Sequence, residues 1–75
     1  MPLYLFNIEN EASDIDSDGI KLRDGETARI EAVKFVGECL QSNPALVMNG
    51  RRFCVEVCTQ SGARLLRIAV TMAEG

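Results

Sequence analysis

The chain has 75 residues, which is enough for one domain, over residues 1–75, and leaves no room for a second core. Its net charge of -3 disfavours nucleic-acid binding, which relies on a basic surface, and the absence of His excludes a His-activated nucleophile within the chain. No apolar run approaches the ~20 residues of a membrane span, and the first residues lack the basic start of a secretory signal. We therefore expect a cytoplasmic protein that contacts neither nucleic acid nor membrane.

Two strand segments are predicted in the first third of the chain. Residues 3–8 alternate with the two-residue period of a strand and are largely apolar on both faces. A strand of this kind is usually central in its sheet or covered on both sides. Residues 9–19 are polar and acidic, which predicts a loop. Residues 20–22 then predict a short edge strand in which Lys21 points outward.

The acidic loop is the one segment with a recognisable metal-ligand spacing. Three carboxylates at every second position precede Gly19, as in the first half of an EF-hand calcium loop. These residues are Asp14, Asp16 and Asp18. The second half of the pattern fails, because Gly25 stands where a bidentate Glu is needed and Lys21 adds a positive charge. The sequence therefore predicts an acidic, solvated turn and no metal or cofactor, with a small metal- or ligand-binding module as the alternative.

A helix is predicted over residues 25–41. Asp24 can cap its first turn, and the Asn43-Pro44 pair ends it. Gly37 inside the pattern costs up to about 1 kcal/mol relative to Ala, and the sequence leaves open whether it permits close packing on a sheet. The apolar stripe at helical spacing consists of Ala28, Ala32, Phe35, Val36 and Cys39, with Val33 and Leu40 beside them.

The last third of the chain predicts a hairpin of residues 51–59 and 63–72, with Ser61 and Gly62 as a two-residue turn. In that register both faces are matched in polarity, whereas a shift by one residue mixes them. One face pairs Val57 with Leu66, Val55 with Ile68, and Phe53 with Val70. The other face pairs Cys58 with Leu65, Glu56 with Arg67, and Cys54 with Ala69.

The three cysteines are predicted to be free thiols. Cys54 and Cys58 lie four residues apart on one strand, so their Cα atoms stand about 13 Å apart, beyond disulfide reach. Cys39 falls on the apolar face of the helix and acts as a small hydrophobic residue. The chain has no Cys-x-x-Cys pair, so a structural zinc site is not expected. Free thiols are typical of a reducing compartment.

Together these elements predict an α+β fold, in which an antiparallel sheet of three long strands, with a possible short fourth, carries one helix on one face. The first strand is expected to pair with residues 51–59, since both are apolar on both faces. The uncovered face would then present an apolar patch made of Leu3, Leu5, Cys54, Cys58, Leu65 and Ala69. Such patches are unusual on monomers, so we predict a symmetric homodimer through this face, with a heterologous partner or an apolar ligand as alternatives.

Three motifs give the chain a family likeness. Residues 1–8 read Met-Pro-x-Tyr-x-Phe-Asn-Ile, residues 18–24 read Asp-Gly-x-x-Leu-x-Asp, and residues 28–32 read Ala-Arg-x-Glu-Ala. In these motifs the chain resembles a family of short proteobacterial proteins of unknown function. It departs from the family pattern at Arg23, where a Pro is common, and at Gly25. The resemblance implies a bacterial cytoplasmic setting and supplies no activity or catalytic residue.

With no convergent polar cluster and no His, the chain is not expected to be an enzyme. The sequence favours a small non-enzymatic interaction or regulatory protein that self-associates through its sheet. The alternative is the module based on the acidic loop, residues 14–19.

Overall fold

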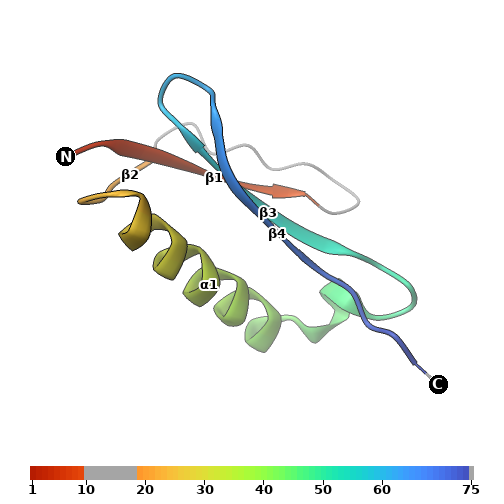
Figure 1. The fold of residues 1–75 in the computed structure, drawn as a ribbon. Coiled ribbons are helices and arrows are strands. Elements are labelled where there is room, and N and C mark those ends of the chain that lie inside the picture. Colours follow the sequence, from red (N-terminus) through yellow and green to blue (C-terminus); the bar gives the residue numbers. More distant parts are fainter. Residues whose placement is uncertain (10–18, 75) are drawn as a thin grey trace.

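The computed structural model describes residues 1–9 and 19–74. Four strands form one antiparallel sheet in the order β2-β1-β3-β4, and an α-helix lies along one face of it (Figure 1). This arrangement confirms the α+β fold, and the possible fourth strand is present as β2. The elements in chain order are β1 (Leu3–Glu9), β2 (Ile20–Lys21), α1 (Gly25–Ser42), the 3-10 helix η1 (Pro44–Val47), β3 (Phe53–Thr59) and β4 (Arg64–Val70).

Strand β1 lies between β2 and β3, so the predicted pairing of the first strand with the Phe53–Thr59 segment is confirmed. Phe6 stands opposite Val57, and Ile8 stands opposite Val55. Both members of each pair point toward α1, because alternate residues of a strand face the same side. The apolar character of β1 and β3 on both faces therefore follows from their central place in the sheet.

Helix α1 meets the sheet through small side chains. Ala28, Ala32 and Val36 recur every fourth residue and are the buried positions of the helix. Phe35 on the flank of this stripe makes an edge-to-face contact with Phe6, with ring centroids 6.2 Å apart and planes at 77°. The polar outer face keeps the helix amphipathic, and none of the helices in the described part of the chain could span a lipid bilayer.

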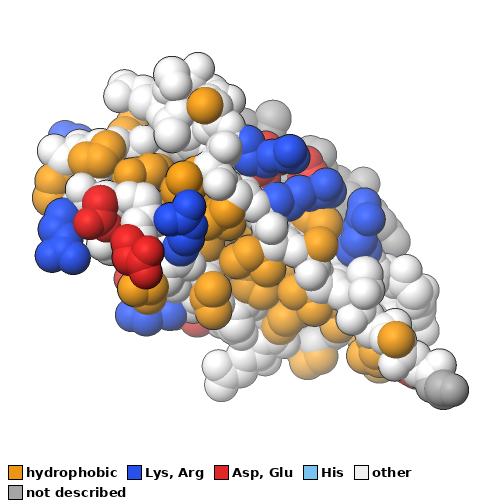
Figure 2. Space-filling model, viewed as in Figure 1, with side chains coloured by type: hydrophobic (Ala, Val, Ile, Leu, Met, Phe, Trp, Pro, Cys, Tyr) orange, Lys and Arg blue, Asp and Glu red, His pale blue; other side chains and the backbone are white. Residues whose placement is uncertain are grey.

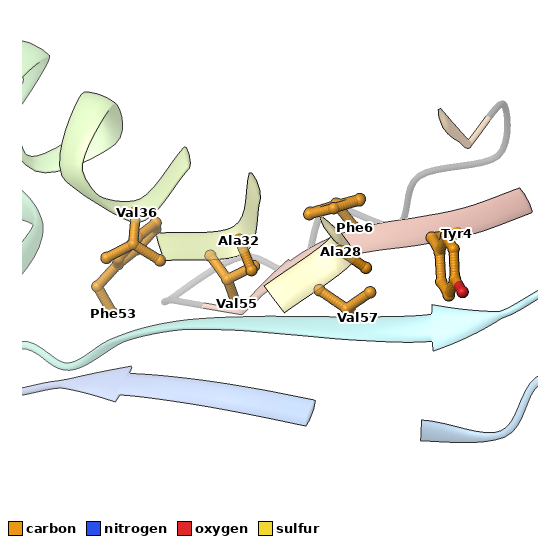
Figure 3. Close-up of a cluster of buried hydrophobic side chains, with 8 residues drawn as sticks. All are labelled: Tyr4, Phe6, Ala28, Ala32, Val36, Phe53, Val55 and Val57. Carbon is orange, nitrogen blue, oxygen red and sulfur yellow. The ribbon is translucent and has the colours of Figure 1, made fainter. Parts of the chain in front are cut away.

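The core lies between α1 and the two central strands (Figure 3). Phe53, Val55 and Val57 of β3 are almost completely buried, and burying each such side chain stabilises the fold by roughly 1.5–3 kcal/mol. Figure 3 shows the helix residues pointing at those of the sheet. The buried cluster consists of Tyr4, Phe6, Ala28, Ala32, Val36, Phe53, Val55 and Val57.

The β3–β4 hairpin confirms most of the predicted register and corrects its end. The five pairs from Phe53–Val70 to Val57–Leu66 are present as predicted, but Cys58 stands opposite Arg64 and not opposite Leu65. The register shift leaves Leu65 as an extra residue, a β-bulge.

The turn that closes this hairpin has three residues, Gln60 to Gly62, and not the predicted two. The amide of Thr59 donates to the carbonyl of Ala63 at 2.8 Å, and the amide of Gly62 donates to the carbonyl of Thr59 at 2.9 Å. Gly62 has a φ of +94°, the conformation expected after a type I turn. The longer turn and the bulge compensate each other, which is why the remaining register is unchanged.

On the outer face of α1, the structure answers the question left open at Gly37 and differs from the prediction at Val33. Gly37 is exposed and a Cβ there would meet no atom within 4 Å, so this glycine does not permit close packing on the sheet. Val33 is 64% exposed, since it lies to one side of the buried stripe. After the helix, η1 and a turn at Asn49 and Gly50, both with positive φ, lead the chain into β3.

Candidate interaction surface

The sheet face turned away from α1, called the far face below, carries five of the six residues predicted to form an interface. Leu3, Leu5, Cys54, Cys58 and Ala69 lie there, because their neighbours in each strand point into the core. They do not form an open apolar patch. Cys54 and Cys58 are only 2% and 8% exposed, and the two leucines are half-buried. Of the five, only Ala69 is exposed.

Leu3 and Leu5 pack against the chain at Gly19, just before β2. A Cβ at Gly19 would lie 2.9 Å from Cγ of Leu3 and 2.9 Å from Cδ2 of Leu5, closer than carbon atoms can approach. Gly19 also has a φ of +76°, a conformation that other residues adopt at a cost. A glycine is therefore required where the chain crosses this part of the far face.

Leu65, the sixth predicted interface residue, lies on the opposite side. The bulge turns it toward α1, where its Cδ1 atom comes within 3.7 Å of the position that a Cβ on Gly25 would take. It packs against the buried core as a half-buried residue. The far-face assignment of Leu65 was wrong because a strand pattern without a bulge alternates faces at every residue.

Polar side chains bridge the strands of the far face. Arg67 Nη2 lies 3.0 Å from Glu9 Oε2 on β1, two strands away, and also donates to Cys54 Sγ at 3.7 Å. Arg64 Nη1 lies 3.5 Å from Glu56 Oε2, because the bulge places Arg64 beside this glutamate. Glu56 and Arg67 face each other in the backbone register, as predicted, but the ion pairs connect different partners. These contacts are partly exposed and each contributes little stability.

Two of the three thiols, those of Cys39 and Cys58, lie in environments that raise their pKa values. Burial, followed by the hydrogen bond to Glu56, raises the pKa of the Cys58 thiol, which donates to Glu56 Oε1 at 3.4 Å. Burial, followed by the charge of Glu38, also raises the pKa of Cys39. All three cysteines are free, as predicted. Because the thiolate is the reactive form, Cys39 and Cys58 are poor nucleophiles at neutral pH.

The candidate metal residues Asp14, Asp16 and Asp18 lie outside the described residues. Within residues 1–9 and 19–74, no group of three or more His, Cys, Asp or Glu side chains could hold a metal ion. The region that would supply the second half of a calcium loop is occupied by β2 and by the start of α1 at Gly25.

Asp24 caps α1 as predicted. Its Oδ1 atom accepts from the Thr27 backbone amide and from the Thr27 hydroxyl, each at 2.8 Å. These bonds, with the backbone bond contributing most, lower the pKa of Asp24 below its usual value. The cap fixes the point at which the chain leaves β2 and begins the helix.

A separate apolar surface lies along β4, at one edge of the described sheet. In Figure 2 a band of hydrophobic side chains crosses the middle of the face on which β4 lies, and Lys and Arg side chains border the band on its upper right. Strand β4 lies at one end of the described sheet, and its core-facing residues are half-buried while those of β3 are fully buried. We define the β4 edge band as the half-buried Leu66, Ile68 and Val70 of β4 together with the exposed Val33 of α1.

Val33 belongs to this band because of its place around the helix. Phe35 contacts Phe6 of β1, so that flank of α1 faces β1. Val33 is two residues away from Phe35, about 160° around the helix axis, and therefore lies on the flank toward β4.

The sequence contained two signals for this surface. Pairing β1 with β3 already implies that β4 is an edge strand whose apolar residues are covered from one side only. The stripe of Ala28, Ala32 and Val36 already places Ile30 and Val33 outside the helix–sheet contact, and they are 50% and 64% exposed. The predicted patch lay on the broad face of the sheet, whereas half-buried apolar side chains also lie along the β4 edge.

Neither the curated proteins nor the solved structures contain a match to this chain. A family model, by contrast, matches residues 3–71, which include every strand and helix of the fold described above. The family match therefore spans nearly the whole chain. The chain belongs to the family described as a domain of unknown function, DUF6894.

Proposed function

We propose that this protein is a small, non-enzymatic interaction or regulatory module that works through the β4 edge band. The observation that carries the proposal is a seven-residue edge strand, Arg64–Val70, whose core-facing side chains are only half-buried. An edge strand presents a row of free amide and carbonyl groups, and a partner strand can pair with them.

The size of the domain supports this proposal. A 75-residue domain buries only about 60–65% of the surface of its unfolded chain, and small domains often gain stability from a partner. A partner strand at β4 would cover Ile68 and its neighbours from the side that is now open. It would also extend the sheet without any change to the core.

The same arrangement favours binding over catalysis. The far face carries ion pairs that hold strands together, such as Arg67 with Glu9, and the thiols of Cys39 and Cys58 have raised pKa values. We assign the protein to the cytoplasm, since three free cysteines suit a reducing compartment.

Site-specific photo-crosslinking in the native cell tests this proposal. One variant carries benzoylphenylalanine in place of the exposed Ala69 of β4, and the matched control carries it in place of Ile20 of β2, which is 49% exposed. We expect covalent protein adducts from position 69 at several times the yield from position 20. Equal yields, or adducts from position 20 alone, would contradict a working surface at β4.

A further inference from the structure

We infer that the partner at the β4 edge band is β4 of a second copy of this chain, paired antiparallel about a two-fold axis at Ile68. This inference rests on the proposed function, because it names the partner of the same surface. The two copies would form one continuous sheet of eight strands, since each contributes the four described above. Self-pairing of this kind uses the same patch on both subunits.

The length of the pairable edge points to this axis. The bulge at Leu65 interrupts the regular strand, and bulges are one of the devices that hinder pairing at an edge. Strand β4 ends at Val70. The regular part of the edge is therefore the five-residue segment 66–70, and its central residue is Ile68. A second copy centred on Ile68 pairs all five residues.

The side chains match in this register. Because the two copies run antiparallel about Ile68, the two residue numbers in each cross-strand pair add up to 136, which is twice 68. Leu66 then faces Val70 and Ile68 faces its own copy on the helix side, while Arg67 faces Ala69 on the far side. On the helix side every apolar residue meets an apolar residue, and on neither side does a charged residue meet a like charge.

The neighbouring registers are worse. An axis at Arg67 sets two arginine side chains directly opposite each other, which is destabilising. An axis at Ala69 sets Leu66 opposite Met72, which lies beyond the end of the strand. An axis between two residues would pair the core side of one copy with the far side of the other. The axis at Ile68 is the one that combines full pairing with matched polarity.

The two-fold axis stands perpendicular to the joined sheet, so both α1 helices lie on the same face of this sheet. Val33 lies on the flank of α1 that faces β4 and hence faces the axis. At the opposite side of each described sheet lies β2, which is two residues long and carries the exposed Lys21. A short, charged edge strand resists pairing with a further copy.

Engineered disulfides test both the partner and the register. In the proposed pairing, the two copies of residue 68 stand directly opposite, with Cα atoms about 4.5–5.5 Å apart, within disulfide reach. The two copies of residue 67 lie diagonally, about 8 Å apart, beyond that reach. Ile68→Cys and Arg67→Cys are therefore oxidised in parallel with wild type by diamide, which accepts the two electrons and two protons released per disulfide.

We expect Ile68→Cys to form a dimer on non-reducing gels at low micromolar concentration, at least tenfold faster than Arg67→Cys or wild type. Faster cross-linking of Arg67→Cys would overturn the register. If circular dichroism shows both variants folded and neither cross-links faster than wild type, pairing with a second copy is overturned. If either variant is unfolded, the wild-type mass decides: sedimentation should give twice the 8.2 kDa of one chain.

The two proposals fail in distinguishable ways. Suppose that wild type sediments as a monomer at 100 µM and that the crosslinker at position 69 forms adducts with another protein. This result would overturn pairing with a second copy and leave the proposed function standing. An absence of adducts from Ala69 in the cell, combined with a monomeric wild type, would overturn both.

Discussion

The two edges of the sheet are built in different ways. On one side, β2 is two residues long, and both Ile20 and Lys21 are exposed. On the other side, β4 is seven residues long, and its core-facing residues are half-buried. Both edges belong to one sheet that packs on one helix. They differ in the length of the edge strand and in the burial of its side chains.

Under the proposed function, this difference directs association to one edge of the sheet. A short edge with a charged residue gives a partner strand few hydrogen bonds and little apolar surface. A long edge with three apolar residues gives a partner strand both hydrogen bonds and apolar surface. The sheet therefore has one edge suited to a partner and one that is not, and the following changes should alter the two sides separately.

The largest effect is expected near the β2 edge, for Gly19→Ala. We expect a loss of roughly 2 kcal/mol in unfolding free energy, because a Cβ would clash with Leu3 and Leu5 and because alanine is strained at the observed φ of +76°. Urea unfolding measures this loss. Gly62→Ala is the matched control, since Gly62 has a φ of +94° but open space around it. Equal losses in the two variants would show that the contact with the leucines contributes nothing.

At the β4 edge, a charge at Ala69 should change association and leave the fold intact. Ala69 would face Arg67 of the second copy twice in each dimer, and each cross-strand charge pair contributes up to about 1 kcal/mol. We expect Ala69→Lys to weaken the dimer by roughly tenfold in Kd and Ala69→Glu to strengthen it by a similar factor. Sedimentation at several concentrations provides the values. Equal effects of the two charges would argue against Arg67 as the opposing residue.

Between the β2 edge and the helix, Asp24 should make stability depend on pH. Its pKa is lowered in the fold, mainly by the hydrogen bond from the Thr27 amide, relative to the usual 3.8. Its contribution is therefore fully present above pH 3.8 and is lost as the pH falls through the lower folded-state pKa. Asp24→Ala should be less stable than wild type at pH 7, and this difference should shrink at pH 2. Asp24→Asn, a neutral cap, should retain most of the stability. A constant difference between wild type and Asp24→Ala would refute this account.

The smallest effect is expected on the outer face of α1, far from both edges. Gly37→Ala should raise the unfolding free energy by up to about 1 kcal/mol, because alanine favours the helix and its Cβ meets no neighbour. Thermal unfolding monitored by circular dichroism measures the gain. Association should not change, and a change would show that the outer face of the helix takes part in the interface.

Much of the fold could be predicted from the sequence because local signals agreed with each other. The period of Phe53 to Val57 matched that of Leu66 to Val70, and Asp24 stood where a helix cap was needed. The bulge could not be predicted with a strict alternation rule. Leu65 and Leu66 are both apolar, so polarity alone could not show that both pack against the core.

The exposure of the far face was harder to predict, because burial there depends on contacts between distant residues. Arg67 reaches Glu9 across the intervening strand β3, and Gly19 packs on Leu3 and Leu5. Neither contact follows from a pairing pattern. Cys54 and Cys58 looked like part of an exposed patch and proved to be buried. The edge position of β4, by contrast, followed from the predicted strand pairing.

The most direct test of the contrast between the edges is amide hydrogen exchange of the wild-type chain, followed by NMR at high and low protein concentration. Where the protein is dimeric, we expect the backbone amides of Arg67 and Ala69 to exchange at least tenfold more slowly than at dilution, while those of Ile20 and Lys21 exchange at the same rate in both samples. Exchange at β4 that does not depend on concentration, or protection that develops at β2 instead, would contradict the account.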